Sequence, residues 1–78
     1  MQRGNYVLKA KENGEDIFIV YDGGEGFTTT KSISHEREIV PFREAAERRK
    51  KMPQKCPAYY PDLRNVEIST IVVEKLEL

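Results

Sequence analysis

A glycine-rich stretch in the first half of the chain resembles a phosphate-binding loop in composition. Residues 22–32 read DGGEGFTTTKS, with three glycines, three threonines and a lysine beside a serine. A phosphate-binding loop places Lys and Ser or Thr directly after its glycines, at the start of a helix. Here Lys31 lies eight residues after Gly23, threonines of strand character intervene, and Asp22 would repel phosphate. The spacing therefore favours a backbone role for the Gly23–Gly26 loop, whose glycines can adopt positive φ where a strand ends.

The chain has one histidine and one cysteine, His35 and Cys56. A catalytic histidine needs an orienting carboxylate and a nucleophile close in space, whereas the side chains next to it on a helical turn point away. Lys55 lies beside Cys56, but no base is expected near the thiol. One cysteine and one histidine cannot assemble a zinc cluster. We therefore expect a structural or exposed histidine, an incidental cysteine, and no catalytic residue, cofactor or metal site.

Basic residues followed by two tyrosines form the most distinctive chemical pattern. The cations are Arg48, Arg49, Lys50, Lys51 and Lys55, and the rings are Tyr59 and Tyr60. Proteins that bind single-stranded nucleic acid use cations along the backbone and aromatic rings that stack on bases. The same cations also suit the C-terminal end of a helix, where the macrodipole favours positive charge. The tyrosines could equally pack beneath the proline-rich loop that holds them.

A protein partner is the interpretation that we favour for this surface, because rigid aromatic side chains give contact area at little entropy cost. The expected partner-binding residues are Arg48, Arg49, Lys51, Lys55, Tyr59 and Tyr60. The strand around Ile71, Val72 and Val73 could also pair with a second copy and form a homodimer. The sequence thus predicts a non-enzymatic protein-interaction module, with single-stranded nucleic-acid binding as the alternative. No membrane or small-molecule partner is expected.

Length and charge bound these expectations. The chain has 78 residues, of which 38% are apolar, with 13 basic and 13 acidic residues. A chain this short supports one core, so a single domain over residues 1–78 is expected. Zero net charge gives no global attraction to nucleic acid or anionic lipid, although residues 41–65 carry seven basic and three acidic residues. No apolar run reaches the ~18 residues of a membrane span, and no signal-peptide pattern is present, which predicts a cytoplasmic location.

The periodicity of apolar residues predicts an α+β fold of the order ββαβ. Strands are expected over residues 5–11 and 16–21, joined by an Asn-Gly turn, and over residues 64–76, with a bulge or a doubly covered stretch where alternation stops. In the first strand Tyr6, Leu8 and Ala10 alternate with Val7, Lys9 and Lys11, which predicts one face towards the core and the other in water. The threonines after the glycine loop could extend a strand, and Ser32 could cap a single helical turn. The sheet is expected to be antiparallel or mixed, with one helix covering one face.

A helix is expected over residues 41–52. Its core-facing stripe is Phe42, Ala45, Ala46, Arg49 and Met52. Pro41 suits the first helical position, and Pro53 is expected to end the helix. Residues 53–62, with three prolines, are expected to form an irregular surface loop.

The succession YVLKA, NG, DIFIVYD, TTTKSISHEREI and PFREAAERRKK resembles small uncharacterised proteins encoded by phages and prophages of Gram-positive bacteria. The similarity covers roughly residues 6–50, with Ile39, Phe42, Ala45 and Ala46 at the apolar positions of the pattern. The resemblance implies an accessory phage protein that binds and modulates a host protein. It carries no functional residues, and the basic helix end and the proline loop lie outside it.

Overall fold

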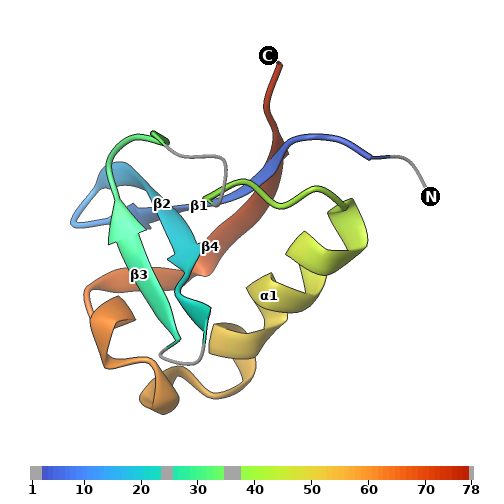
Figure 1. Cartoon of the computed structure of the whole chain (residues 1–78). Coiled ribbons are helices and arrows are strands. Elements are labelled where there is room, and N and C mark those ends of the chain that lie inside the picture. The colour runs from blue at the N-terminus through green and yellow to red at the C-terminus, as the bar shows by residue number, and fades with distance from the viewer. Residues whose placement is uncertain (1–2, 24–25, 35–37, 78) are drawn as a thin grey trace.

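The computed structural model describes residues 3–23, 26–34 and 38–77, which form a four-stranded sheet with one helix. The elements are β1 (Tyr6–Glu12), β2 (Glu15–Tyr21), β3 (Phe27–Thr30), α1 (Arg43–Lys55), the 3₁₀ turns η3 (Pro57–Tyr59) and η4 (Pro61–Leu63), and β4 (Val66–Lys75). The strand order is β3-β2-β1-β4, and α1 lies across one face of the sheet (Figure 1). The predicted α+β class, with an N-terminal hairpin, one helix and a C-terminal strand, is confirmed.

The N-terminal hairpin forms where the Asn-Gly signal predicts it. Asn13 has a φ of 53° and Gly14 a φ of 83°, and Glu12 pairs with Glu15 across the turn. Two consecutive positive φ angles are what a type I′ turn requires, and they match the twist of the flanking strands. The strands extend one residue closer to the turn than the predicted ranges on both sides.

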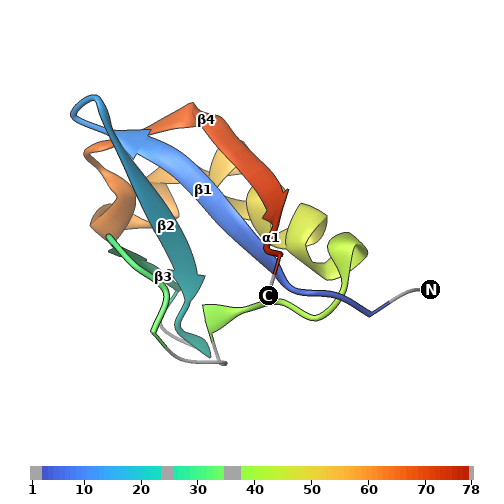
Figure 2. The ribbon, with the colours of Figure 1, turned by 90° about the horizontal axis from the view of Figure 1, so that it is seen from above.

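All neighbouring strands are antiparallel, which settles the alternative of a mixed sheet. The threonines after the glycine loop form β3 at one edge, so the element order is βββαβ and contains one strand more than expected. At the other edge β4 pairs with β1. The helix therefore does not join two parallel strands. In the chain it connects β3 to β4, which lie at opposite edges of the sheet (Figure 2).

The core lies between α1 and the sheet. Tyr6, Leu8 and Ala10 of β1 are buried there, as their alternation predicts. The prediction that the other face of this strand lies in water is wrong at Val7, which is also buried. Chain after β3 returns to this strand, where Val40 forms a β-bridge with Tyr6.

The helix is displaced towards the C-terminus relative to its predicted bounds. Pro41 precedes the N-cap residue Phe42 in an extended segment, and its carbonyl accepts a hydrogen bond from the Gly4 N–H. At the other end, the prediction that Pro53 ends the helix is wrong. Pro53 lies inside α1 and is buried, and the Cys56 N–H donates to the Met52 carbonyl beyond it. A proline removes one hydrogen bond, and burial of its ring offsets part of that loss.

This displacement also alters the core-facing stripe. Ala46 is fully buried and Ala45 packs against the core, as expected, but Met52 is 40% exposed. Seven residues are close to two helical turns, so Pro53 rather than Met52 lies in line with Ala46. The expected stripe is therefore wrong at its last position.

A bulge interrupts β4, as the loss of alternation suggested. Lys9 pairs with Val72 and Lys11 with Glu67, so Ala10 alone faces the four intervening residues of β4. The Thr70 hydroxyl occupies the gap, where it accepts from the Lys11 N–H at 2.9 Å and donates to the Glu67 carbonyl at 2.6 Å. The bulge turns Ile71 into the core of the same chain, while Val72 stays exposed.

The single helical turn expected after Ser32 falls largely on residues 35–37, outside the described residues. On either side of them, the Ser34 N–H and hydroxyl both donate to the Glu38 carboxylate.

Candidate protein-binding surface

Three cations share the outward face of the C-terminal half of α1. Arg48, Lys51 and Lys55 lie at spacings of three and four residues, on the side of the helix opposite Ala46 and Pro53, and all three are exposed. We call them the basic stripe. Glu44 lies one turn before Arg48 on the same face and bounds the stripe. None of the three forms an ion pair with another described residue.

The other cations of the helix are already engaged within the protein. The Arg49 guanidinium carbon lies 4.9 Å from the centroid of the Tyr21 ring, and that of Arg43 lies 5.3 Å from the Tyr6 ring. Lys50 lies 3.9 Å from Glu47, one turn earlier. Arg49, one of the residues expected to bind a partner, packs its charge and stem against Tyr21 and so links α1 to the end of β2.

Two consecutive 3₁₀ turns replace the irregular loop that three prolines suggested. Pro57 and Pro61 each occupy the start of a turn, where a missing N–H is not needed. Four backbone hydrogen bonds close them: Tyr59 N–H to Cys56, Tyr60 N–H to Pro57, Leu63 N–H to Tyr60 and Arg64 N–H to Pro61, at 2.9–3.2 Å. These hydrogen bonds give the backbone of residues 56–64 a defined conformation after the end of α1.

The two adjacent tyrosines have opposite environments. Tyr60 packs edge-on against Phe27, with ring centroids 5.2 Å apart, and a Cβ at Gly26 would approach its ring to 3.3 Å. Tyr59, one residue earlier, is 79% exposed. Tyr60 thus anchors the turns to β3, together with the buried Leu63, while the Tyr59 ring projects into solvent.

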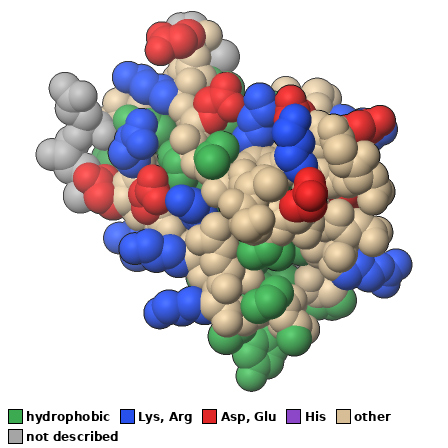
Figure 3. Space-filling view, turned by 180° about the vertical axis from the view of Figure 1, so that it is seen from behind, with side chains coloured by type: hydrophobic (Ala, Val, Ile, Leu, Met, Phe, Trp, Pro, Cys, Tyr) green, Lys and Arg blue, Asp and Glu red, His purple; other side chains and the backbone are tan. Residues whose placement is uncertain are grey.

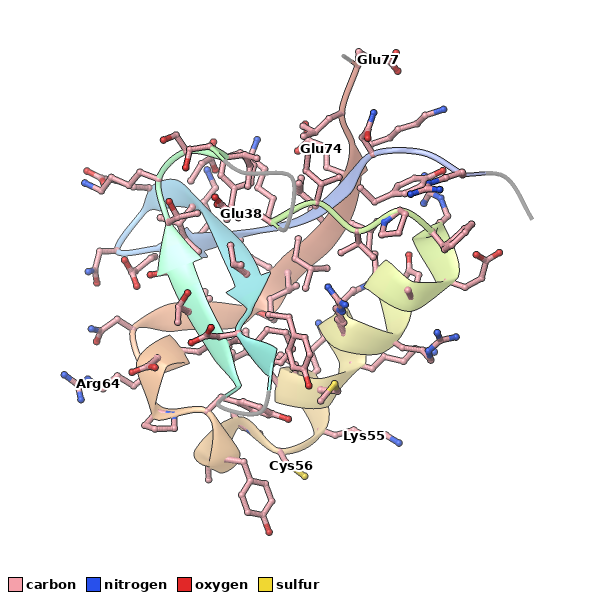
Figure 4. The ribbon with its side chains drawn as sticks, viewed as in Figure 1. Glu38, Lys55, Cys56, Arg64, Glu74 and Glu77 are labelled. Carbon is pink, nitrogen blue, oxygen red and sulfur yellow. The ribbon has the colours of Figure 1, made fainter. Side chains whose placement is uncertain are left out.

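Apolar side chains reach the surface around Tyr59. Figure 3 shows hydrophobic side chains gathered at the lower end of the molecule, where η3 lies in Figure 1, with basic side chains beside them on the α1 side. In Figure 4, Lys55 and Cys56 lie side by side at this end, and Arg64 points outward from the far side of the turns. Met52, between Lys51 and Lys55, and Cys56, between Lys55 and Tyr59, are also exposed. The chain therefore leads from exposed cations without ion-pair partners among the described residues to an exposed aromatic ring.

Charges on the opposite face of the sheet are paired among themselves. Lys9 lies 3.7 Å from Asp16 and 3.5 Å from Glu74, and Lys11 lies 2.6 Å from Asp16. The hydrogen bond from Lys11 holds the pKa of Asp16 below its usual range, against a smaller opposing effect of desolvation. Lys9 and Lys11 are therefore paired with carboxylates, whereas no cation of the basic stripe lies within ion-pair distance of a carboxylate among the described residues.

The glycine loop has the geometry of a chain reversal. Gly23 has a φ of 59° and Gly26 a φ of 102°, both in the region that favours glycine, and the Asp22 N–H donates to the Gly26 carbonyl at 2.6 Å. Lys31 lies 3.6 Å from Glu15. Gly24 lies outside the described residues. The backbone role predicted for Gly23 and Gly26 is confirmed.

His35 also lies outside the described residues. Among the residues that are described, no group of three or more His, Cys, Asp or Glu side chains could hold a metal ion. Within the same part of the chain, no helix has both the length and the apolar character needed to cross a bilayer.

Of the six residues predicted to bind a partner, Arg48, Lys51, Lys55 and Tyr59 are exposed, the three cations on one face of α1 and Tyr59 in the turn that follows the helix. It gives Arg49 and Tyr60 contacts inside the protein. Sequence reasoning assigned Met52 to the core, because it lies ten residues after Phe42 on the predicted apolar stripe. No family model, curated protein or solved structure matches the chain.

Proposed function

We propose that the protein is a non-enzymatic binding module that docks a protein partner on the basic stripe and the η3 turn. The observation that carries the proposal is the exposed Tyr59 ring on a backbone held by hydrogen bonds and by its buried neighbours. Aromatic side chains on rigid backbone are typical anchors of protein interfaces, because little entropy is lost when they bind. If the resemblance to phage accessory proteins holds, this partner is a host protein.

The free edge of β4 is a weaker candidate for binding. Its bulge splits the regular pairing into residues 66–67 and 72–75, and Gln54 of α1 donates its side-chain N–H to the Ile68 carbonyl within the bulge at 3.3 Å. Interrupted edges of this kind resist the addition of a further strand. The homodimer version of the proposal therefore has less support than the docking of another protein at η3.

Single-stranded nucleic acid is the competing occupant of the same surface. Binders of this class stack successive bases on several rings. Here Tyr60 is engaged with Phe27, which leaves Tyr59 as the exposed ring of the pair. One exposed ring suits a single anchor contact with a protein better than a run of stacked bases.

Affinity capture with a matched variant tests the proposal. Wild-type protein and Tyr59→Ala are immobilised and exposed to a lysate of the source organism, and the retained proteins are identified by mass spectrometry. The proposal expects a protein that wild type retains and the variant loses. The purified partner should then bind Tyr59→Ala at least tenfold more weakly in a direct titration, since anchor aromatics contribute about 2 kcal/mol or more.

Two results would contradict the proposal. One is retention of the same proteins by wild type and by Tyr59→Ala. The other is Tyr59-dependent binding of a labelled single-stranded oligonucleotide, with affinity falling steeply as salt increases. Light scattering at high micromolar concentration tests the homodimer version separately, because a monomer there removes it.

A further inference from the structure

We infer that the docked partner presents an acidic segment to the basic stripe, next to an apolar residue that contacts Tyr59. This inference rests on the proposed function and adds the chemistry of the partner. Its basis is the position of the three cations in α1, their lack of acidic partners, and the apolar surface beside them.

The helix macrodipole does not account for the basic stripe. Cations stabilise a helix through the dipole only within its last turn. Because α1 continues to Lys55, only Lys55 lies in that turn, while Arg48 and Lys51 lie before it. A helix ending at residue 52, as the sequence suggested, would have placed Lys51, but not Arg48, in its last turn. In the structure, the macrodipole therefore accounts for Lys55 but not for Arg48 and Lys51.

Internal ion pairing does not account for the stripe either. Lys9, Lys11, Lys31 and Lys50 each lie within ion-pair distance of a carboxylate, whereas Arg48, Lys51 and Lys55 have no such neighbour among the described residues. Three like charges on one helical face repel one another, since residues three and four apart are neighbours. Glu44 and Glu47 lie four residues before Arg48 and Lys51, but neither is within ion-pair distance of the stripe, and Glu47 pairs with Lys50. An acidic segment across this face would relieve that repulsion and provide the missing counter-charges.

The apolar side chains define the second half of the recognition. Tyr59 is 79% exposed and Met52 is 40% exposed, and Met52 lies one position from Lys51 on the helix. Thioether and phenol side chains adapt to aliphatic and aromatic contacts. A partner segment with Asp or Glu residues and one large apolar side chain therefore fits this surface, whereas a purely anionic polymer would leave the apolar part unused.

Selection from a random peptide library on the immobilised full-length protein tests this chemistry. The expected peptides are enriched in Asp and Glu and contain a large apolar residue. A selected peptide should bind at least tenfold more weakly to Tyr59→Ala and to the double variant Lys51→Glu/Lys55→Glu. Its affinity should also fall with rising salt, because exposed charges are screened over roughly 8 to 10 Å at 0.1 to 0.15 M.

A control variant with the same change in net charge is available at the other end of the molecule. Arg3 and Lys75 are exposed and lie near the termini, away from η3 (Figure 1). Arg3→Glu/Lys75→Glu should leave peptide binding unchanged. Circular dichroism of both double variants checks that each keeps its fold.

The outcomes separate this inference from the proposed function. Peptides that need Tyr59 but are neutral, and bind equally to the Lys51→Glu/Lys55→Glu variant, would overturn the acidic-partner inference and leave the docking surface intact. Equal loss of binding in both charge-reversed variants would overturn it too, because the effect would then be one of net charge. A library without any Tyr59-dependent peptide would also overturn the acidic-partner inference. The proposed docking surface is tested separately, by capture from the lysate.

Discussion

The Arg49 guanidinium lies over the Tyr21 ring, with its central carbon 4.9 Å from the ring centroid. The Tyr21 ring in turn lies 5.3 Å from the Phe27 ring, and Phe27 lies 5.2 Å from Tyr60. A continuous row of contacts thus links α1, the end of β2, β3 and the 3₁₀ turns. Through this row the helix and the turns keep a fixed position relative to the sheet, which orients the basic stripe and Tyr59 together.

Replacing Arg49 by Ala should lower the free energy of unfolding by about 1 kcal/mol, through loss of the cation–π contact and of stem packing. Arg48→Ala is the matched control, since Arg48 lies about 100° around the helix from Arg49 and is exposed, so its loss should change stability by less than about 0.5 kcal/mol. Urea denaturation measures both. Equal stabilities of the two variants would show that the contact with Tyr21 contributes nothing.

The adjacent tyrosines should separate stability from binding. Tyr60→Ala should cost about 2 kcal/mol of stability, because it leaves a void beside Phe27, whereas Tyr59→Ala should cost less than about 0.5 kcal/mol. Thermal or urea unfolding followed by circular dichroism compares them. A large loss of stability in Tyr59→Ala would mean that its ring supports the fold, which its exposure argues against.

The Thr70 hydroxyl should be needed for the bulge of β4. Thr70→Val keeps the shape but removes the acceptor of the Lys11 N–H, which should cost about 0.5 to 1.5 kcal/mol because this hydrogen bond is exposed. Thr70→Ser retains the hydroxyl and should stay close to wild type. Hydrogen exchange at the Lys11 amide gives a local readout, with faster exchange expected in the valine variant only. Similar exchange rates in both variants would argue against this hydrogen bond.

The depressed pKa of Asp16 predicts an acid-dependent loss of stability. A carboxyl with a lower pKa in the folded state contributes stability above its unfolded pKa of about 3.9, and that contribution is lost as pH falls through the folded value. Asp16→Asn lacks this contribution at any pH. The stability difference between wild type and Asp16→Asn should therefore shrink as pH falls below about 4. A difference that stays constant between pH 7 and pH 2 would contradict the assignment.

Local patterns in the sequence determined much of the fold. Asn13 and Gly14 determine the hairpin because only residues that tolerate positive φ suit its turn. Alternation predicted the core face of β1, and the 3.6-residue period predicted a helix with Ala45 and Ala46 towards the core. The cations and tyrosines of the binding surface were visible as a composition pattern, and the stretch around Ile71 suggested a bulge. Each of these signals depends on residues close together in the chain.

Contacts between distant segments decided the rest. Pro53 continues the helix because its ring is buried in the core, a compensation that no local rule contains. The antiparallel pairing of β4 with β1 and the bridge between Tyr6 and Val40 depend on where the chain returns to the sheet. Likewise, Tyr59 and Tyr60 are identical in the sequence, and only the position of Phe27 buries one ring and exposes the other. Residue types therefore showed which side chains could bind, whereas tertiary packing decided which of them remain available to a partner.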